Sequence, residues 1–199
     1  MRWERFFDDL EDELASEWEA ERAAVETEAE RLRLSRVDLR RRLRALAGAE
    51  AALVFDLVDG SGLRGAAAGV GADWVSVLPS EGGGAVLVPL HAVAAITAPH
   101  PELLRSARAG EEGSALADRM TFGFAVRDLV RRRTPLGVHL ISGRRLHGTI
   151  DRAGADHLDL ALHDPGSARR ADAVTGYRVI PYSGVARITL ESSDSLRVG

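Results

Sequence analysis

The chain has 199 residues, 45% of them hydrophobic, which is enough for one or two ordinary domains with real cores. It has no cysteine, which excludes disulfides, thiol nucleophiles and cysteine-ligated metal centres. Lysine is also absent, so all 26 basic residues are arginine, and neither a Schiff-base amine nor a P-loop lysine is available. No segment approaches the ~20 apolar residues of a membrane span, and the N-terminus lacks a signal peptide's apolar run. We therefore expect a cytoplasmic protein that makes no membrane contact.

Charge is strongly segregated at the beginning of the chain. Residues 1–30 contain 12 acidic residues and 3 arginines, whereas residues 31–48 contain 7 arginines and a single aspartate, Asp38. We interpret residues 1–34 as a charged helical arm that pairs with a partner protein or with a second copy of itself. Glu21 and Glu28 interrupt the apolar seam and weaken a coiled-coil interpretation. The seam consists of Trp3, Phe7, Leu10, Leu14, Trp18, Val25 and Leu32.

An internal repeat follows the arm. The stretch from Phe55 to Gly65 matches the stretch from Val138 to Gly148, and Pro89 with its flanking residues matches Pro181. This repeat predicts a first module over residues 35–98, a linker over 99–113, a second module over 114–191 and a tail over 192–199. The matched positions are Leu57 with Leu140, Gly60 with Gly143, Leu63 with Leu146, Gly65 with Gly148, and Ile96-Thr97 with Ile188-Thr189.

Each module begins with a predicted helix, from Ser35 to about Ala47 and from Ser114 to Arg133. Five short strands follow in each copy, with alternating apolar positions such as Leu158, Leu160 and Leu162. Glycine inside the second strand suits the sharp bend of a small barrel. We therefore predict a mainly β protein with helices (α+β): two tandem five-stranded barrels, each preceded by a helix, behind a long N-terminal helical arm.

The stretch from Val138 to Leu160 resembles the first sequence motif of the Sm-like (LSm) family, one of the SH3-like small β-barrels. With both copies counted, the resemblance covers about two-thirds of the chain. The tandem arrangement with a charged helix also resembles uncharacterised proteins of high-GC Gram-positive bacteria. The Sm-like resemblance implies assembly into a homo-oligomer and contact with single-stranded RNA.

The best candidate site is a basic patch. Arginine binds phosphate bidentately and stacks on bases, which favours RNA contact, although a helix C-terminus also attracts cations for structural reasons. We include His157 in this site, and Trp74 is either an exposed stacking platform or a contact between the barrels. The arginines of the patch are Arg131, Arg132, Arg133, Arg144 and Arg145.

Other chemistry has little support in the sequence. His157, Asp159 and His163 share one predicted strand face and have the side chains of metal ligands, but solvent-facing strand residues are the favoured interpretation. We predict no metal, no cofactor and no catalytic residue. The first hypothesis is a non-catalytic adaptor that binds proteins through its arm and its paired barrels. The alternative is a protein that contacts single-stranded RNA through the arginines of the second barrel.

Overall fold

The computed structural model describes residues 2–47, 52–108, 116–166 and 169–190. In the first helix, the side chains are described from Trp18 onwards, except for Ala20. The chain divides into two compact units, residues 1–38 and residues 39–199.

The first unit contains helix α1 (Arg2–Ser35). Its described side chains lie in solvent, including Trp18, Val25 and Leu32, which are 66%, 64% and 54% exposed. Arg33 pairs with Glu30 at 2.7 Å, one helical turn away. The first four positions of the predicted seam, from Trp3 to Leu14, fall outside the described side chains. Among the described side chains of α1 no packed seam is present within the single chain, and pairing of this helix with a partner protein or a second copy stays a prediction.

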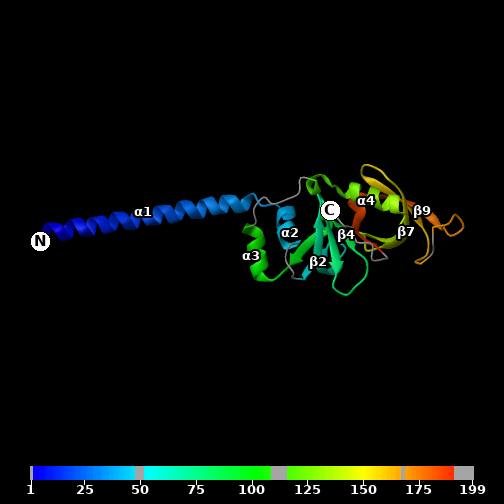
Figure 1. Ribbon diagram of the computed structural model, residues 1–199, viewed down its shortest axis with the longest axis horizontal. Coiled ribbons are helices and arrows are strands. Elements are labelled where there is room, and N and C mark those ends of the chain that lie inside the picture. The colour runs from blue at the N-terminus through cyan, green and yellow to red at the C-terminus, as the bar shows by residue number, and fades with distance from the viewer. Residues whose placement is uncertain (1, 48–51, 109–115, 167–168, 191–199) are drawn as a thin grey trace. The chain divides into compact units, whose positions relative to one another are not determined.

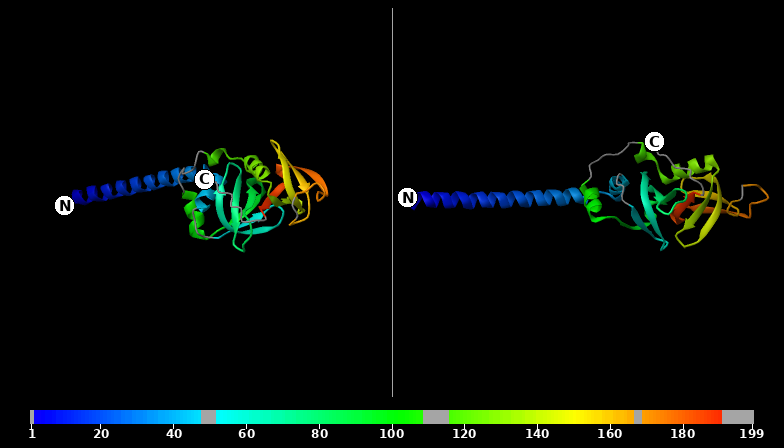
Figure 2. Two further views of the ribbon diagram at one scale, coloured as in Figure 1. Left: turned by 45° about the vertical axis from the view of Figure 1, so that its right-hand side comes forward. Right: turned by 60° about the horizontal axis from the view of Figure 1, so that its bottom comes forward.

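The second unit is built on one antiparallel sheet of ten strands, ordered β5-β1-β2-β3-β4-β10-β6-β7-β8-β9. Figures 1 and 2 show the strands and helices of this unit. We call β1 to β5 with their helices the first half, and β6 to β10 with theirs the second half. The strands of the first half are β1 (Leu53–Leu57), β2 (Gly62–Val70), β3 (Trp74–Pro79), β4 (Val86–Pro89) and β5 (Val93–Thr97). Those of the second half are β6 (Pro135–Leu140), β7 (Arg145–Ala153), β8 (His157–Leu162), β9 (Gly176–Pro181) and β10 (Val185–Leu190).

The prediction of two separate five-stranded barrels is therefore wrong. Strand β4 pairs with β10, with Leu87 opposite Ile188 and Val86 opposite Thr189, and this pairing joins the two sets of strands. A short 3-10 turn after Pro89 leads β5 away from β4 to pair with β1. That turn leaves the second edge of β4 available to a strand from the other half, so the sheet continues instead of closing.

The internal repeat is visible in the backbone. Gly60 and Gly143 both adopt a φ of 81° in the first hairpin turn of their half, a conformation that favours glycine. Gly65 and Gly148 lie against the neighbouring strand so closely that a Cβ would come 2.2 Å from the carbonyl oxygen of Leu78, or 2.1 Å from that of Ala161. The 3-10 turns Leu90–Ala92 and Tyr182–Gly184 also correspond.

The helices of the second unit lie beside the sheet. They are α2 (Leu39–Ala47), α3 (His100–Arg108) and α4 (Phe122–Arg132), and a 3-10 turn, Ala117–Arg119, comes before α4. Both predicted module helices are thus shorter than expected. Helix α2 packs against β2, and α4 packs against β7, which are equivalent strands of the two halves.

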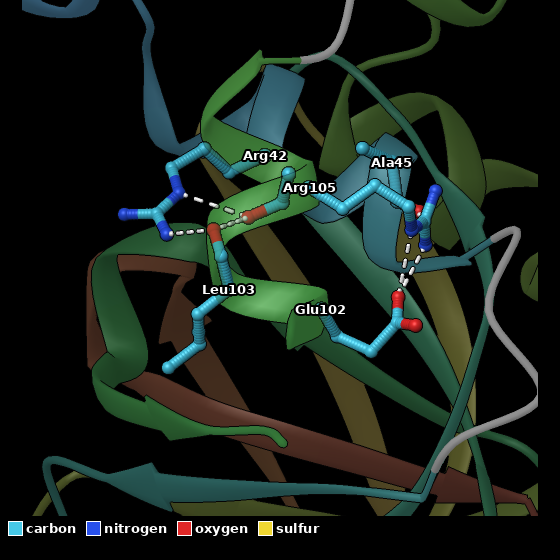
Figure 3. Close-up of polar contacts among 6 residues, drawn as sticks. Arg42, Ala45, Glu102, Leu103 and Arg105 are labelled. Atoms are coloured by element: carbon cyan, nitrogen blue, oxygen red, sulfur yellow. Dashed lines mark hydrogen bonds and ion pairs between the residues drawn. The ribbon is translucent and has the colours of Figure 1, made fainter. Parts of the chain in front are cut away.

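Arginine side chains tie α3 to α2 (Figure 3). Arg42 donates to the carbonyl oxygen of Leu103 at 3.0 Å and to the hydroxyl of Ser106 at 3.2 Å. Arg105 donates to the carbonyl oxygen of Ala45 at 2.7 Å and pairs with Glu102. The carbonyl of Ala45 lies in the last turn of α2, where a helix end leaves carbonyl groups without partners inside the helix, so the bond from Arg105 satisfies it.

The turn between β2 and β3 docks onto the start of α4. Asp73 accepts a hydrogen bond from the backbone N–H of Phe122 at 2.5 Å, and the indole of Trp74 donates to the carbonyl oxygen of Met120 at 2.8 Å. Trp74 is 1% exposed and packs into the core of the second half. It is therefore a contact between the halves, and the interpretation of an exposed stacking platform is wrong.

Across the described residues, no helix has the length and apolar content needed to cross a bilayer.

Candidate functional site

Three consecutive arginines end helix α4. Asp128, one turn earlier, accepts from Arg131 at 2.8 Å and from Arg132 at 2.7 Å. Arg133 terminates the helix in the left-handed region, with φ 50°, and its backbone N–H donates to the carbonyl oxygen of Val130. It is exposed, and no ion pair of Arg133 is found among the described residues. Arg133 therefore ends the helix with an exposed side chain.

Two of these arginines line a recess of about 490 Å³ between the end of α4 and strand β7. On β7, Asp151 accepts two hydrogen bonds from Arg169, both at 2.5 Å. These bonds and the charge of Asp151 raise the pKa of Arg169 above its usual value. The side chain of Arg152 is 84% exposed, and one of its guanidinium nitrogens lies 4.0 Å from a carboxylate oxygen of Asp159. The residues lining the recess are Val130, Arg131, Arg133, Ile150, Asp151, Arg152 and Arg169; we call it the arginine recess.

The charge of the arginine recess favours an anion. Four guanidinium groups line it, and Asp151, which Arg169 holds, is the one carboxylate among the lining residues. Asp128 and Asp159, which are not lining residues, pair with Arg131 and Arg152. Guanidinium groups match the geometry of phosphate oxygens and form paired, charge-assisted hydrogen bonds with them. The C-terminal end of a helix is itself unfavourable for anions, so the attraction for an anion here comes from the arginine side chains.

The other two arginines of the predicted patch lie elsewhere. Arg144 is in the turn between β6 and β7 and borders a different groove, beside β9. Arg145 begins β7 opposite His139, whereas Ile150 and Asp151 lie toward the other end of the same strand. The predicted patch is thus divided: Arg131 and Arg133 share the recess, Arg132 is held by Asp128, and Arg144 and Arg145 belong to the opposite end of the hairpin.

His157 is outside the recess as well. It begins β8, and its Nδ1 lies 2.8 Å from a carboxylate oxygen of Asp156. Its ring packs on Gly154, where a Cβ would come within 2.5 Å of it. The side chain of His157 therefore packs against the turn between β7 and β8.

The suspected metal ligands do not come together. His163 is 3% exposed, and its Nε2 lies 2.9 Å from the hydroxyl of Thr149. His157 and Asp159 are on β8, and His163 follows that strand. Within the described ranges, no group of three or more histidine, aspartate or glutamate side chains is placed to hold a metal ion.

A polar cluster that the sequence did not indicate lies where the two halves join. His139 on β6 accepts at Nδ1 from the guanidinium of Arg187 on β10 at 3.4 Å. Burial and the charges of Arg187 and Arg145 lower the pKa of His139 to about 4, against the opposing effect of Asp59. Burial alone would raise the pKa of Asp59. Two hydrogen bonds from Ser61, together with the charges of Arg187 and His139, leave that pKa below its usual value.

Sequence reasoning missed Arg152 and Arg169 because neither is near the arginine run of α4 in the chain. The sequence of β7 gave a partial signal for Arg152: Ile150 is an inward-facing position of this strand, and Asp151 and Arg152 follow it toward the same end of the strand. Arg169 belongs to the long insertion of the second copy, and no periodicity placed it. No protein-family model matches the chain, and no curated protein matches its sequence.

Proposed function

We propose that this protein is a non-catalytic binding protein that holds the phosphate backbone of single-stranded RNA in the arginine recess. The observation that carries the proposal is the concentration of Arg131, Arg133, Arg152 and Arg169 around one recess with a single, already paired carboxylate. A recess of about 490 Å³ is within the range of small-ligand sites and accommodates a nucleotide unit.

The proposal differs from the RNA hypothesis drawn from the sequence in where it places the contact. Arg144, Arg145 and His157 are not part of the site. Arg133 and Arg152 are its most important members, because Arg131 and Arg169 already pair closely with aspartates. Backbone contacts of this kind are tolerant of base sequence, since phosphate is the same at every nucleotide.

The test is fluorescence anisotropy of a labelled 15-nucleotide oligouridylate at 50 and 200 mM salt. With three or four phosphate contacts, counterion release predicts a loss of affinity of about 20- to 50-fold over this range. Arg133→Glu and Arg152→Glu should each weaken binding about tenfold or more and reduce the salt dependence.

Arg64→Glu is the matched control. Arg64 is an exposed arginine on β2 of the first half, and its replacement by glutamate changes the net charge by the same amount. Equal losses in Arg64→Glu and Arg133→Glu would indicate a non-specific charge effect and reject the recess as the site. No binding at 50 mM salt would reject the RNA proposal altogether.

A protein-binding role, the first hypothesis from the sequence, has support from a different part of the molecule. The outer strand of the second half, β9, exposes Tyr177 and Val179, which are 61% and 71% accessible. Among the described residues β9 pairs on one edge only, and apolar side chains beside such an edge are a common site of protein association.

A further inference from the structure

Strand β9 forms one end of the sheet and, among the described residues, pairs only with β8. Its counterpart in the first half is β4, since Pro181 matches Pro89 and Val179 therefore matches Leu87. Leu87 is completely buried, whereas Val179 is 71% exposed. The same side-chain position is thus covered in one half of the molecule and uncovered in the other.

The cover in the first half is strand β10. It pairs with the free edge of β4, and its Ala186 is completely buried within the core of the first half. Leu57 and Leu63 belong to the same core, at 3% and 9% exposure. Strand β10 therefore fills a groove between β4 and the first hairpin.

In the part of the chain that the structure describes, no strand fills the corresponding groove of the second half. This groove has a volume of about 250 Å³ and lies between β9 and the turn that joins β6 to β7. Leu140 and Leu146, the counterparts of Leu57 and Leu63, line it together with Ile180. Arg144 and Arg178 also border it, and both are exposed. We call this the β9 groove.

The two grooves differ in charge. Asp59 and Ser61 lie in the first hairpin turn, where Asp59 interacts electrostatically with Arg187 of β10. In the second half the equivalent positions carry Ser142 and Arg144. The filled groove has a carboxylate opposite a basic strand residue, and the open groove has a guanidinium at the corresponding turn. Charge complementarity therefore requires an acidic residue in the occupant where β10 has Arg187.

We propose that the β9 groove binds an extended acidic segment of a partner protein as an eleventh strand. Its backbone would pair with the free edge of β9, a small apolar side chain would enter the groove as Ala186 does in the first half, and a carboxylate would meet Arg144 and Arg178. This site is independent of the arginine recess and does not rest on the RNA proposal.

Other occupants fit less well. Strand β5 of a second copy is the repeat counterpart of β10, but it consists of Val93, Ala94, Ala95, Ile96 and Thr97 and offers no carboxylate. A nucleic acid would meet the two arginines but has no aliphatic side chain for the leucine-lined floor. An added strand that carries an acidic side chain would use the edge of β9, the leucine-lined floor and the two arginines of the rim.

The experiment uses the full chain labelled with ¹⁵N and a six-residue peptide that copies β10 with one charge reversed, Val-Ala-Glu-Ile-Thr-Leu. Its partner peptide keeps the arginine, Val-Ala-Arg-Ile-Thr-Leu. We expect saturable shifts of the Tyr177 to Ile180 amide signals. The acidic peptide should bind at least about fivefold more tightly than the arginine peptide, since the charge contacts are partly exposed.

Arg144→Glu should remove that preference, because the new carboxylate offsets the charge of Arg178, and Arg64→Glu should leave it unchanged; the dispersion of the amide spectrum shows that each variant is folded. Equal affinity for both peptides, or a preference that survives Arg144→Glu, overturns the proposal. It is also overturned if oligouridylate displaces the peptide. Concentration-dependent dimerisation that Val179→Asp abolishes, with no peptide binding, would assign the groove to a second copy of the chain instead.

Discussion

The polar cluster at the junction makes folding stability depend on pH, and His139→Gln tests this. In the folded protein the pKa of His139 is lowered from 6.5 to about 4, first by burial and then by Arg187 and Arg145. Protonation at Nδ1 would also break the contact with Arg187 and place two cations side by side. The unfolded chain therefore takes up a proton at a higher pH than the folded one, and stability falls as pH drops from about 6.5 to about 4.

The size of the effect follows from the two pKa values. Between pH 7 and pH 5, a shift from 6.5 to about 4 corresponds to a loss of at most about 1.8 kcal/mol. Because the imidazole is only partly buried and its surroundings are screened by solvent, we expect about 1 kcal/mol. His139→Gln removes the titrating group, so the wild type should lose about 1 kcal/mol more than the variant between these pH values.

Urea unfolding at pH 7 and pH 5, followed by tryptophan fluorescence, measures this difference, since Trp74 is buried in the folded state. Arg187→Gln should give an intermediate pH dependence, because it removes the second of the three causes. Equal pH dependence in the wild type and in His139→Gln would refute the argument.

Two further substitutions test how the halves are built and joined. Gly148→Ala forces a Cβ to within 2.1 Å of the carbonyl oxygen of Ala161 and should destabilise the fold by about 2–4 kcal/mol, or prevent folding. Gly60→Ala meets open space and only the strain of a φ of 81°, so its free energy of unfolding, measured in urea, should fall by about 1 kcal/mol. Asp73→Ala removes the hydrogen bond from the N–H of Phe122 and should lower the free energy of unfolding by about 1–2 kcal/mol in the same assay. The backbone amides of α4 should then exchange faster with solvent.

The sequence predicted the parts of each half much better than their assembly. Its repeated glycines correctly marked equivalent turns, because Gly60 and Gly143 need the same positive φ. Alternation correctly placed Leu158 and Leu160 inside, and both are completely buried. These are local requirements, set by the neighbours of a residue along one strand or turn.

The junction of the halves was not predictable in the same way. Pairing of β4 with β10 depends on segments that are far apart in the chain, and period-two alternation says nothing about which strand lies next. One signal was present: Val86, Leu87 and Val88 form a continuous apolar run, and all three are buried because both faces of β4 are covered. The prediction of separate barrels assumed that each half closes on itself.

The candidate site shows the same limit. The run of arginines at the end of α4 was easy to see, but a helix, a strand and a distant loop together form the arginine recess. Arg144 was grouped with that run only because it is also an arginine. Its actual surroundings, on the rim of the β9 groove, depend on where β9 lies relative to the β6–β7 turn.

Pairing between β4 and β10 also has a consequence during synthesis on the ribosome. The strand that covers β4 is translated roughly 100 residues later, which at typical rates is a delay of ~5–20 s. During that interval the first half has Leu87 and the edge of β4 without the cover of β10. Nascent chains with such edges are prone to associate with one another. Chaperone engagement at β4, or slow translation after it, would then govern the yield of native protein.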